Sequence, residues 1–80
     1  MNTERVILIV DKKNDKLINE CNINSIDLYK LYEIIQPPEN DPLLYKTYKI
    51  KKSHVKRLEE LVKIKFDLKK YSYQIDCFQM

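Results

Sequence analysis

The side chains that could perform catalysis or bind a metal are few and lie far apart in the sequence. His54 is the single histidine, and Cys21 and Cys77 are the two cysteines. A catalytic nucleophile needs a base beside it, and a structural zinc ion needs four ligands. His54 has no neighbouring cysteine or carboxylate, so we expect it to be an exposed polar residue. The cysteines are expected to be buried free thiols. The sequence predicts no metal site and no cofactor.

Asp67 and Asp76 are a second arrangement that could do chemistry, because two carboxylates can serve as acid and base. We expect instead that Asp67 forms hydrogen bonds in a turn and that Asp76 lies on an exposed strand face. The chain contains no glycine, which the usual phosphate-binding loops, dinucleotide fingerprints and nucleophile elbows all require. These observations predict a binding protein without catalytic residues rather than an enzyme.

The C-terminal segment 71–78 carries the clearest signal of secondary structure. Its side chains alternate with a period of two, as in a strand with one buried face. The face expected in or beside the core carries Tyr71, Tyr73, Ile75 and Cys77. The opposite face carries Ser72, Gln74 and Asp76. This polar face is left free to contact a partner.

Two earlier segments are expected to form a hairpin in the same sheet. Residues 5–10 are almost all apolar and β-branched, which is typical of a strand that is central in its sheet or covered on both faces. Residues 11–15 form a polar turn, where Asn14 or Asp15 can adopt the positive φ that glycine would normally supply. Residues 16–23 then alternate, with one face predicted to carry Leu17, Cys21 and Ile23.

A first helix is expected between Ser25, whose hydroxyl can cap its start, and the pair Pro37 and Pro38, which stop it. Its apolar face has helical spacing and comprises Leu28, Leu31, Tyr32 and Ile35. Tyr29 and Tyr32 are therefore expected in the core or at its rim.

A third strand is expected over residues 43–50, and a second helix, with Ser53 as its N-cap, over residues 54–63. One strand face would carry Leu44, Lys46, Tyr48 and Ile50, and the other Tyr45, Thr47 and Lys49. The apolar stripe of the helix would be Val55, Leu58 and Val62. The order ββαβαβ predicts a single α+β domain over residues 1–80. Its four-stranded, mainly antiparallel sheet would carry both helices on one face.

Composition limits where the protein acts. No run of about 18 apolar residues exists, so no transmembrane helix is predicted. The apolar run 6–10 is too short for a signal peptide and follows Glu4, so we expect a cytoplasmic protein without membrane contact. The net charge of +3 is uneven: residues 1–40 carry five basic and seven acidic side chains, and residues 41–80 carry ten and five.

Six basic side chains lie between Lys46 and Arg57 without an acidic residue among them. With Tyr45 and Tyr48 interleaved, this pattern suggests a small nucleic-acid-binding module, in which charges contact phosphates and rings stack on bases. However, Lys46 and Lys49 must point to opposite faces of a strand, and lysines at a strand edge also discourage aggregation. An acidic protein surface would suit the same residues. Nucleic-acid binding is therefore the alternative to protein binding.

Three segments, 10–13, 40–45 and 66–73, carry a family resemblance. They read Val-Asp-Lys-Lys, Asn-Asp-Pro-Leu-Leu-Tyr and Phe-Asp-Leu-Lys-Lys-Tyr-Ser-Tyr. Together with the element order, they resemble the cloacin-type immunity proteins and related small immunity proteins of bacterial toxin systems. The resemblance implies a monomer that binds the C-terminal domain of a cognate toxin, often a nuclease, one to one. It would neutralise that toxin inside the producing cell and its siblings.

One departure from that family concerns charge, because cloacin-type immunity proteins are typically acidic and this chain is basic. Either the partner differs in charge, or the contacts use acidic side chains. Those acidic side chains are Asp11, Asp15, Glu20, Glu33 and Glu39. The candidate partner-binding surface is the helix-free sheet face, which would comprise Tyr45, Thr47, Lys49, Ser72, Gln74 and Asp76. Lys51 and Lys52 would form its charged rim, and Tyr45 is the expected anchor.

Overall fold

The sheet is built around its N-terminal strand. The computed structural model describes residues 3–79, in which β1 (Thr3–Asp11) lies between β2 (Leu17–Asn22) and β4 (Tyr71–Gln79). Strand β4 in turn pairs with the short β3 (Tyr48–Lys49), so the strand order is β2-β1-β4-β3. Every neighbouring pair is antiparallel. The prediction that the apolar N-terminal run is a central strand is confirmed.

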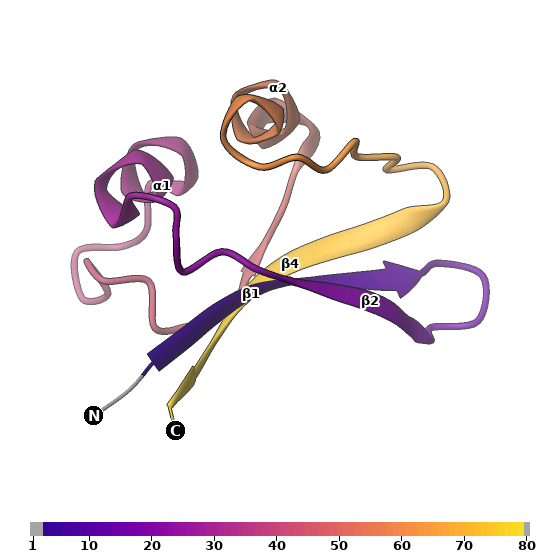
Figure 1. Ribbon diagram of the computed structural model, residues 1–80, viewed down its shortest axis with the longest axis horizontal. Helices are drawn as coiled ribbons and strands as arrows, with labels where there is room; N and C mark the ends of the chain where they lie inside the picture. The colour runs from indigo at the N-terminus through magenta and orange to yellow at the C-terminus, as the bar shows by residue number, and fades with distance from the viewer. Residues whose placement is uncertain (1–2, 80) are drawn as a thin grey trace.

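Two helices, α1 (Leu28–Ile35) and α2 (Lys52–Leu61), lie on one side of the sheet, as Figure 1 shows. Between them and the sheet lies the core, in which Ile7 of β1 is the register partner of Ile75 of β4 and both are fully buried. The other buried core residues are Ile23, Leu31, Ile34, Ile35, Leu44, Ile50, Leu58, Val62 and Tyr73. The predicted α+β fold, with a four-stranded antiparallel sheet and two helices, is confirmed.

Helix α1 begins two residues later than the sequence suggests. Asp27, rather than Ser25, is the N-cap, because its Oδ1 accepts a hydrogen bond of 2.9 Å from the amide of Tyr29. The helix ends where expected, at Gln36, whose φ of 53° is left-handed. The following proline excludes a further helical turn, so the chain must turn there.

Helix α2 begins at Lys52, and its N-cap is Lys51 rather than the expected Ser53. The imidazole of His54 turns back to the start of the helix, where its Nδ1 accepts a 3.0 Å hydrogen bond from the amide of Lys51. This bond satisfies an amide that has no partner within the helix. His54 is therefore half-buried and has a structural role, whereas the sequence suggested an exposed side chain.

The capping bond of His54 predicts a loss of stability in mild acid. Burial, and then the positive charge of Lys51, lower the pKa of His54 below 6.5. Because the folded-state pKa is the lower one, the unfolded chain binds the proton first as the pH falls. The contribution of His54 to stability is therefore complete above pH 6.5 and is lost as the pH falls through the folded-state pKa.

His54→Gln is the matched control for this prediction. Glutamine at the same helical position can accept the cap hydrogen bond but does not titrate. We expect wild type to lose stability relative to this variant as the pH falls below 6.5, measured by urea unfolding. Parallel pH profiles for the two proteins would contradict the prediction.

Strand β2 contains an irregularity that moves one predicted core residue to the surface. The register shifts between Ile9 and Val10, so that Ile9 pairs with Asn19 but Val10 pairs with Leu17. The inserted residue reverses the expected alternation of side chains in β2. Leu17 therefore does not share the face of Cys21, and the side chain of Leu17 is 55% exposed. In the preceding turn, Asp15 has the positive φ that the sequence predicted for Asn14 or Asp15.

The segment before β3 is not the strand that the sequence predicts over residues 43–50. Asp41 is buried, and its carboxylate accepts hydrogen bonds from the amides of Tyr45 (2.9 Å) and Lys46 (3.0 Å) and from the hydroxyl of Tyr48. Those two amides are therefore bonded to a side chain and not to a neighbouring strand. The chain makes a tight loop, with Leu44 at a φ of 56°, and joins the sheet only at Tyr48. We call this arrangement the Asp41 clasp.

Candidate functional site

Five of the eight predicted partner-binding residues come together on the helix-free face of the sheet. Thr47 donates its hydroxyl hydrogen to Oδ1 of Asp76, and Gln74 donates from Nε2 to Oδ2 of the same carboxylate over 3.1 Å. Lys49 is the register partner of Gln74, and Ser72 has the same strand parity as Gln74 and Asp76. The edge formed by β3 and β4 therefore presents a hydrogen-bonded polar surface, as expected.

Tyr45, the expected anchor of that face, lies elsewhere. Its ring is 5.6 Å from the guanidinium carbon of Arg5, and Nη2 of Arg5 also donates a 2.7 Å hydrogen bond to the carbonyl of Leu43. Arg5 has the strand parity of the core residue Ile7, which is on the helix-covered face. The prediction that Tyr45 shares a face with Thr47 is wrong, because the Asp41 clasp removes Tyr45 from the strand.

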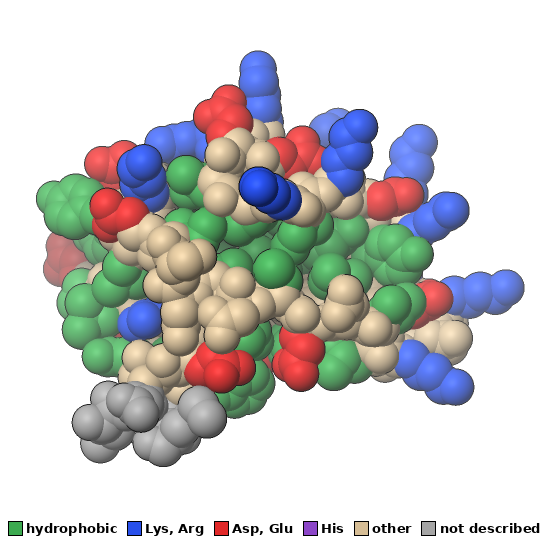
Figure 2. All heavy atoms as spheres, in the orientation of Figure 1, with side chains coloured by type: hydrophobic (Ala, Val, Ile, Leu, Met, Phe, Trp, Pro, Cys, Tyr) green, Lys and Arg blue, Asp and Glu red, His purple; other side chains and the backbone are tan. Residues whose placement is uncertain are grey.

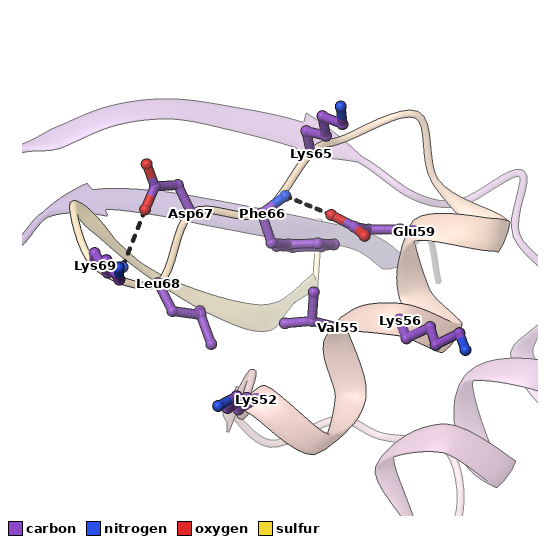
Figure 3. Close-up of a pocket in the computed structure, with 9 residues that line it drawn as sticks. All are labelled: Lys52, Val55, Lys56, Glu59, Lys65, Phe66, Asp67, Leu68 and Lys69. Atoms are coloured by element: carbon purple, nitrogen blue, oxygen red, sulfur yellow. Dashed lines mark hydrogen bonds between the residues drawn. The ribbon is translucent and has the colours of Figure 1, made fainter.

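Lys51 and Lys52 do not continue the helix-free face either. Lys51 caps α2, and Lys52, in the first turn of that helix, lines a groove between α2 and residues 65–69 (Figure 3). The helices cover the opposite side of the sheet (Figure 1). The predicted lysine rim is therefore absent from the polar edge formed by β3 and β4.

The helix-free face has an apolar and acidic part that the sequence analysis did not identify. Val6, Leu8 and Val10 of β1 all have the parity of this face, which is opposite to that of Ile7, but Val6 is buried and only Leu8 and Val10 are partly exposed. Register pairing places Asp76 beside Val6, Glu20 beside Leu8 and Glu4 beside the 45% exposed Phe78. Figure 2 shows acidic side chains along the lower edge of the molecule, away from the helices. The sequence does carry a sign of this apolar part, because residues 5–10 are almost all apolar, whereas a strand with only one buried face alternates apolar and polar side chains.

An exposed group of tyrosines forms a second surface, and it too was missed. Tyr29 is 73% exposed and Tyr32 is 40% exposed, with ring centroids 6.5 Å apart. They line a hollow of about 460 Å³ together with Asp27, Leu28, Pro42 and Leu43. The prediction that both tyrosines lie in the core or at its rim is wrong for Tyr29, and Tyr32 is not a core residue either, because α1 buries Leu31, Ile34 and Ile35 instead.

We call Tyr29, Tyr32, Pro42, Leu43 and Tyr45 the tyrosine patch. Leu43 and Tyr45, which are 44% and 45% exposed, are both held by contacts with Arg5. Tyrosine and arginine are enriched at the centres of protein interfaces, where a rigid ring buries apolar area and its hydroxyl keeps a polar contact. The patch is therefore a surface suited to binding another protein.

The basic run from Lys46 to Arg57 does not form one surface. Lys49 is on the helix-free face, whereas Lys52 and Lys56 line the groove beside α2. Arg57 faces another hollow, between α1 and α2, which Glu33 and Glu60 also line. The charges that suggested a nucleic-acid-binding module are thus distributed over three sides of the domain.

The acidic residues considered as an alternative contact surface are also dispersed. Glu20 lies on the helix-free face, Glu33 lies between the helices, and Oδ1 of Asp11 accepts a hydrogen bond from the amide of Lys13 at the hairpin. The helix-free face obtains its acidic character mainly from residues outside that set, Glu4 and Asp76.

The remaining candidates for chemistry have structural surroundings. Cys21 and Cys77 are free thiols, as expected, but both are half-buried rather than buried. Oδ1 of Asp67 accepts hydrogen bonds from the amides of Lys69 and Lys70, which is the predicted turn role. Within residues 3–79 no group of three or more potential ligands could hold a metal ion. In the same range, no helix has both the length and the apolar character needed to cross a membrane.

Comparison with protein families identifies a family for this chain. A family model described as "Domain of unknown function (DUF7683)" matches residues 4–76, which include all of α1, β2, β3 and α2 and most of β1 and β4. No curated protein matches the chain.

Proposed function

This chain belongs to the DUF7683 family of domains of unknown function, and we propose that it is an immunity protein, acting in the cytoplasm, that binds a cognate toxin domain and neutralises it. The partner would be the C-terminal domain of a bacterial toxin, of the nuclease type, bound one to one. Inhibition would come from tight binding alone, without a reaction or a cofactor.

The tyrosine patch is the observation that carries this proposal. Four of its residues, Tyr29, Tyr32, Leu43 and Tyr45, expose 40% or more of their surface although each is largely apolar. Tyr29, Tyr32 and Leu43 surround one hollow, and Tyr45 is joined to Leu43 through Arg5. An isolated exposed apolar side chain is ordinary, but such a group marks an interaction site. Rings of this kind anchor the tightest protein complexes, because they bury a large area at a small entropic cost.

The resemblance to cloacin-type immunity proteins supports the choice of partner. One of its three segments is 40–45, which contains both the buried Asp41 and the exposed side chains of Leu43 and Tyr45. The segment that carries the resemblance therefore also builds part of the proposed contact surface.

The acidic side chains of the helix-free face are consistent with a toxin that has a basic surface. Among the residues paired in the four described strands, Glu4, Glu20 and Asp76 lie on this face with one basic residue, Lys49, although the whole chain has a net charge of +3. A nuclease domain presents basic side chains to its nucleic acid, and such a surface would complement these carboxylates. The overall charge of the chain therefore does not exclude a basic toxin.

The proposal is tested by co-expression with the protein encoded directly upstream. Where that neighbour is a large secreted protein, its C-terminal domain should stop growth when expressed alone and permit growth when this chain is present. The two should also elute together as a one-to-one complex in size-exclusion chromatography. Continued toxicity in the presence of folded protein, or separate elution, would overturn the proposal.

A further inference from the structure

A broad groove lies between α2 and residues 65–69, and Figure 3 shows the side chains around it. The groove has a volume of about 940 Å³. Val55 of α2 and Phe66 and Leu68 of the facing segment form its apolar floor, whereas the lysines stand at its edges. Those lysines are Lys52, Lys56, Lys65 and Lys69. We call this site the lysine groove.

Two carboxylates line the lysine groove, but both are bonded to the backbone. Oε2 of Glu59 accepts a 2.9 Å hydrogen bond from the amide of Phe66, and this bond fixes the facing segment against α2. Oδ1 of Asp67 accepts from the amides of Lys69 (3.1 Å) and Lys70 (3.3 Å). Four ammonium groups against two carboxylates leave the groove with a formal charge of +2.

The positive surface continues beyond the groove. A neighbouring hollow of about 460 Å³ is lined by Lys12, Lys13 and Lys70, shares Lys69 with the lysine groove, and has a single carboxylate, Asp11, among the described residues that line it. Oδ1 of Asp11 accepts a hydrogen bond from the amide of Lys13. Nζ of Lys12 donates a hydrogen bond to the carbonyl of Leu68, which joins the β1–β2 turn to the groove segment. Figure 2 shows Lys and Arg side chains projecting along the side of the molecule that carries the helices and the turn. The two hollows thus form one basic band.

We propose that the lysine groove binds an extended acidic segment of a protein. Its carboxylates would lie along the basic band, and an apolar side chain would enter the floor formed by Val55, Phe66 and Leu68. Charge complementarity specifies the class of partner, and the apolar floor specifies an amphipathic segment. The tyrosine patch lies over α1, at the other end of the molecule (Figure 1), so this proposal is independent of the immunity proposal.

The floor of the groove favours a peptide over a nucleic acid. Phe66 is the only aromatic residue that lines it, and its ring packs edge-on against Tyr73 with centroids 4.7 Å apart. Binding of single-stranded nucleic acid relies on several exposed rings on which successive bases stack, and one half-buried ring does not supply such a platform. Lysine also binds single carboxylates as a point charge, whereas phosphate recognition favours the planar fork of arginine.

Fluorescence anisotropy with defined probes tests the proposal. The first probe is a labelled peptide in which Asp and Glu flank a central Leu-Phe pair. The second has the same charges with Ser-Ser at the centre, and the third is an oligothymidylate strand. We expect the first probe to bind most tightly, and more weakly as salt is raised.

Charge reversal assigns the binding to the groove. Lys56→Glu combined with Lys65→Glu should weaken binding of the first peptide about tenfold or more, since both side chains are exposed at the groove edge. The charge-matched control is Lys16→Glu combined with Lys30→Glu, two exposed lysines that do not line the groove, and it should leave affinity unchanged. Three results would each overturn the proposal: the groove variant and the control variant weaken binding equally, the wild type binds the Ser-Ser peptide as tightly as the Leu-Phe peptide, or it binds oligothymidylate more tightly than the Leu-Phe peptide.

Discussion

Replacing Asp41 with alanine is expected to lower the free energy of unfolding by about 3 kcal/mol, a large share of the stability of so small a domain. The substitution removes the acceptor for the amides of Tyr45 and Lys46 and for the hydroxyl of Tyr48. Buried donors left without a partner cost more than the hydrogen bonds themselves contribute. Urea unfolding at neutral pH, followed by circular dichroism, measures the loss.

The Asp41 clasp should also limit stability at both ends of the pH scale. Burial raises the pKa of Asp41, but the hydrogen bonds from Tyr48, Lys46 and Tyr45 and the charge of Lys46 outweigh it and hold the pKa below 3.8. Its contribution is therefore present above pH 3.8 and is lost as the pH falls through the folded-state pKa. Burial, followed by the hydrogen bond and charge of Asp41, raises the pKa of Tyr48 to about 12. That contribution is present below pH 10.0 and is lost as the pH rises toward about 12.

Tyr48→Phe is the control that separates the contribution of the Tyr48 hydroxyl from that of the Asp41 carboxylate. It keeps the ring but removes the hydroxyl, so we expect a smaller loss of about 1.5 kcal/mol and no alkaline dependence from this site. Ultraviolet titration should likewise lose the tyrosine that ionises at the highest pH. A stability of Asp41→Ala within about 0.5 kcal/mol of wild type, the range of ordinary surface substitutions, would show that the clasp is not required.

Truncating Tyr29 to alanine is expected to weaken binding of the toxin domain by about 2 kcal/mol, or roughly 30-fold, if the tyrosine patch is the centre of the interface. Its side chain is 73% exposed, so the same substitution should leave unfolding almost unchanged. The expected pattern is lost affinity with retained stability, which distinguishes a contact residue from a core residue. Isothermal titration calorimetry with the purified toxin domain measures the affinity.

Two controls locate the interface on the domain. Ile18→Ala removes a 51% exposed apolar side chain from β2, far along the sheet from α1, and should leave affinity unchanged. Lys49→Glu tests the helix-free face, where an added carboxylate should strengthen binding of a basic toxin. If Tyr29→Ala and Tyr45→Ala both bind as wild type, the patch is not the interface. A loss of affinity on Lys49→Glu would show that the partner surface there is acidic.

The parts of the fold that local patterns specify could be predicted from the sequence. The alternation from Tyr71 onward and the apolar run at 5–10 identify β4 and β1, because side-chain period reports directly on burial. The turn residue Asp15 and the stop at Pro37 follow from backbone preferences that hold in any context. These features need no knowledge of residues distant in the sequence.

The errors arose where a single side chain or a single inserted residue overrides the local pattern. The carboxylate of Asp41 binds two amides that the pattern of residues 43–50 would assign to a strand, and so Tyr45 was placed on the wrong face. One inserted residue opposite Val10 reverses the orientation of Leu17. The exposure of Tyr29 could not be predicted, because an apolar side chain on the surface and one in the core look the same in a sequence.

The strand order has a consequence for how the protein acquires its structure during synthesis. The nine register pairs between β1 and β4 join residues at opposite ends of the described chain, and β3 pairs only with β4. A growing chain on the ribosome therefore cannot complete the sheet until β4 has emerged. Contacts of such long sequence separation also slow the folding reaction. We expect the domain to fold as one late, cooperative event after translation of β4, and fragments that lack β4 to be degraded rather than to accumulate.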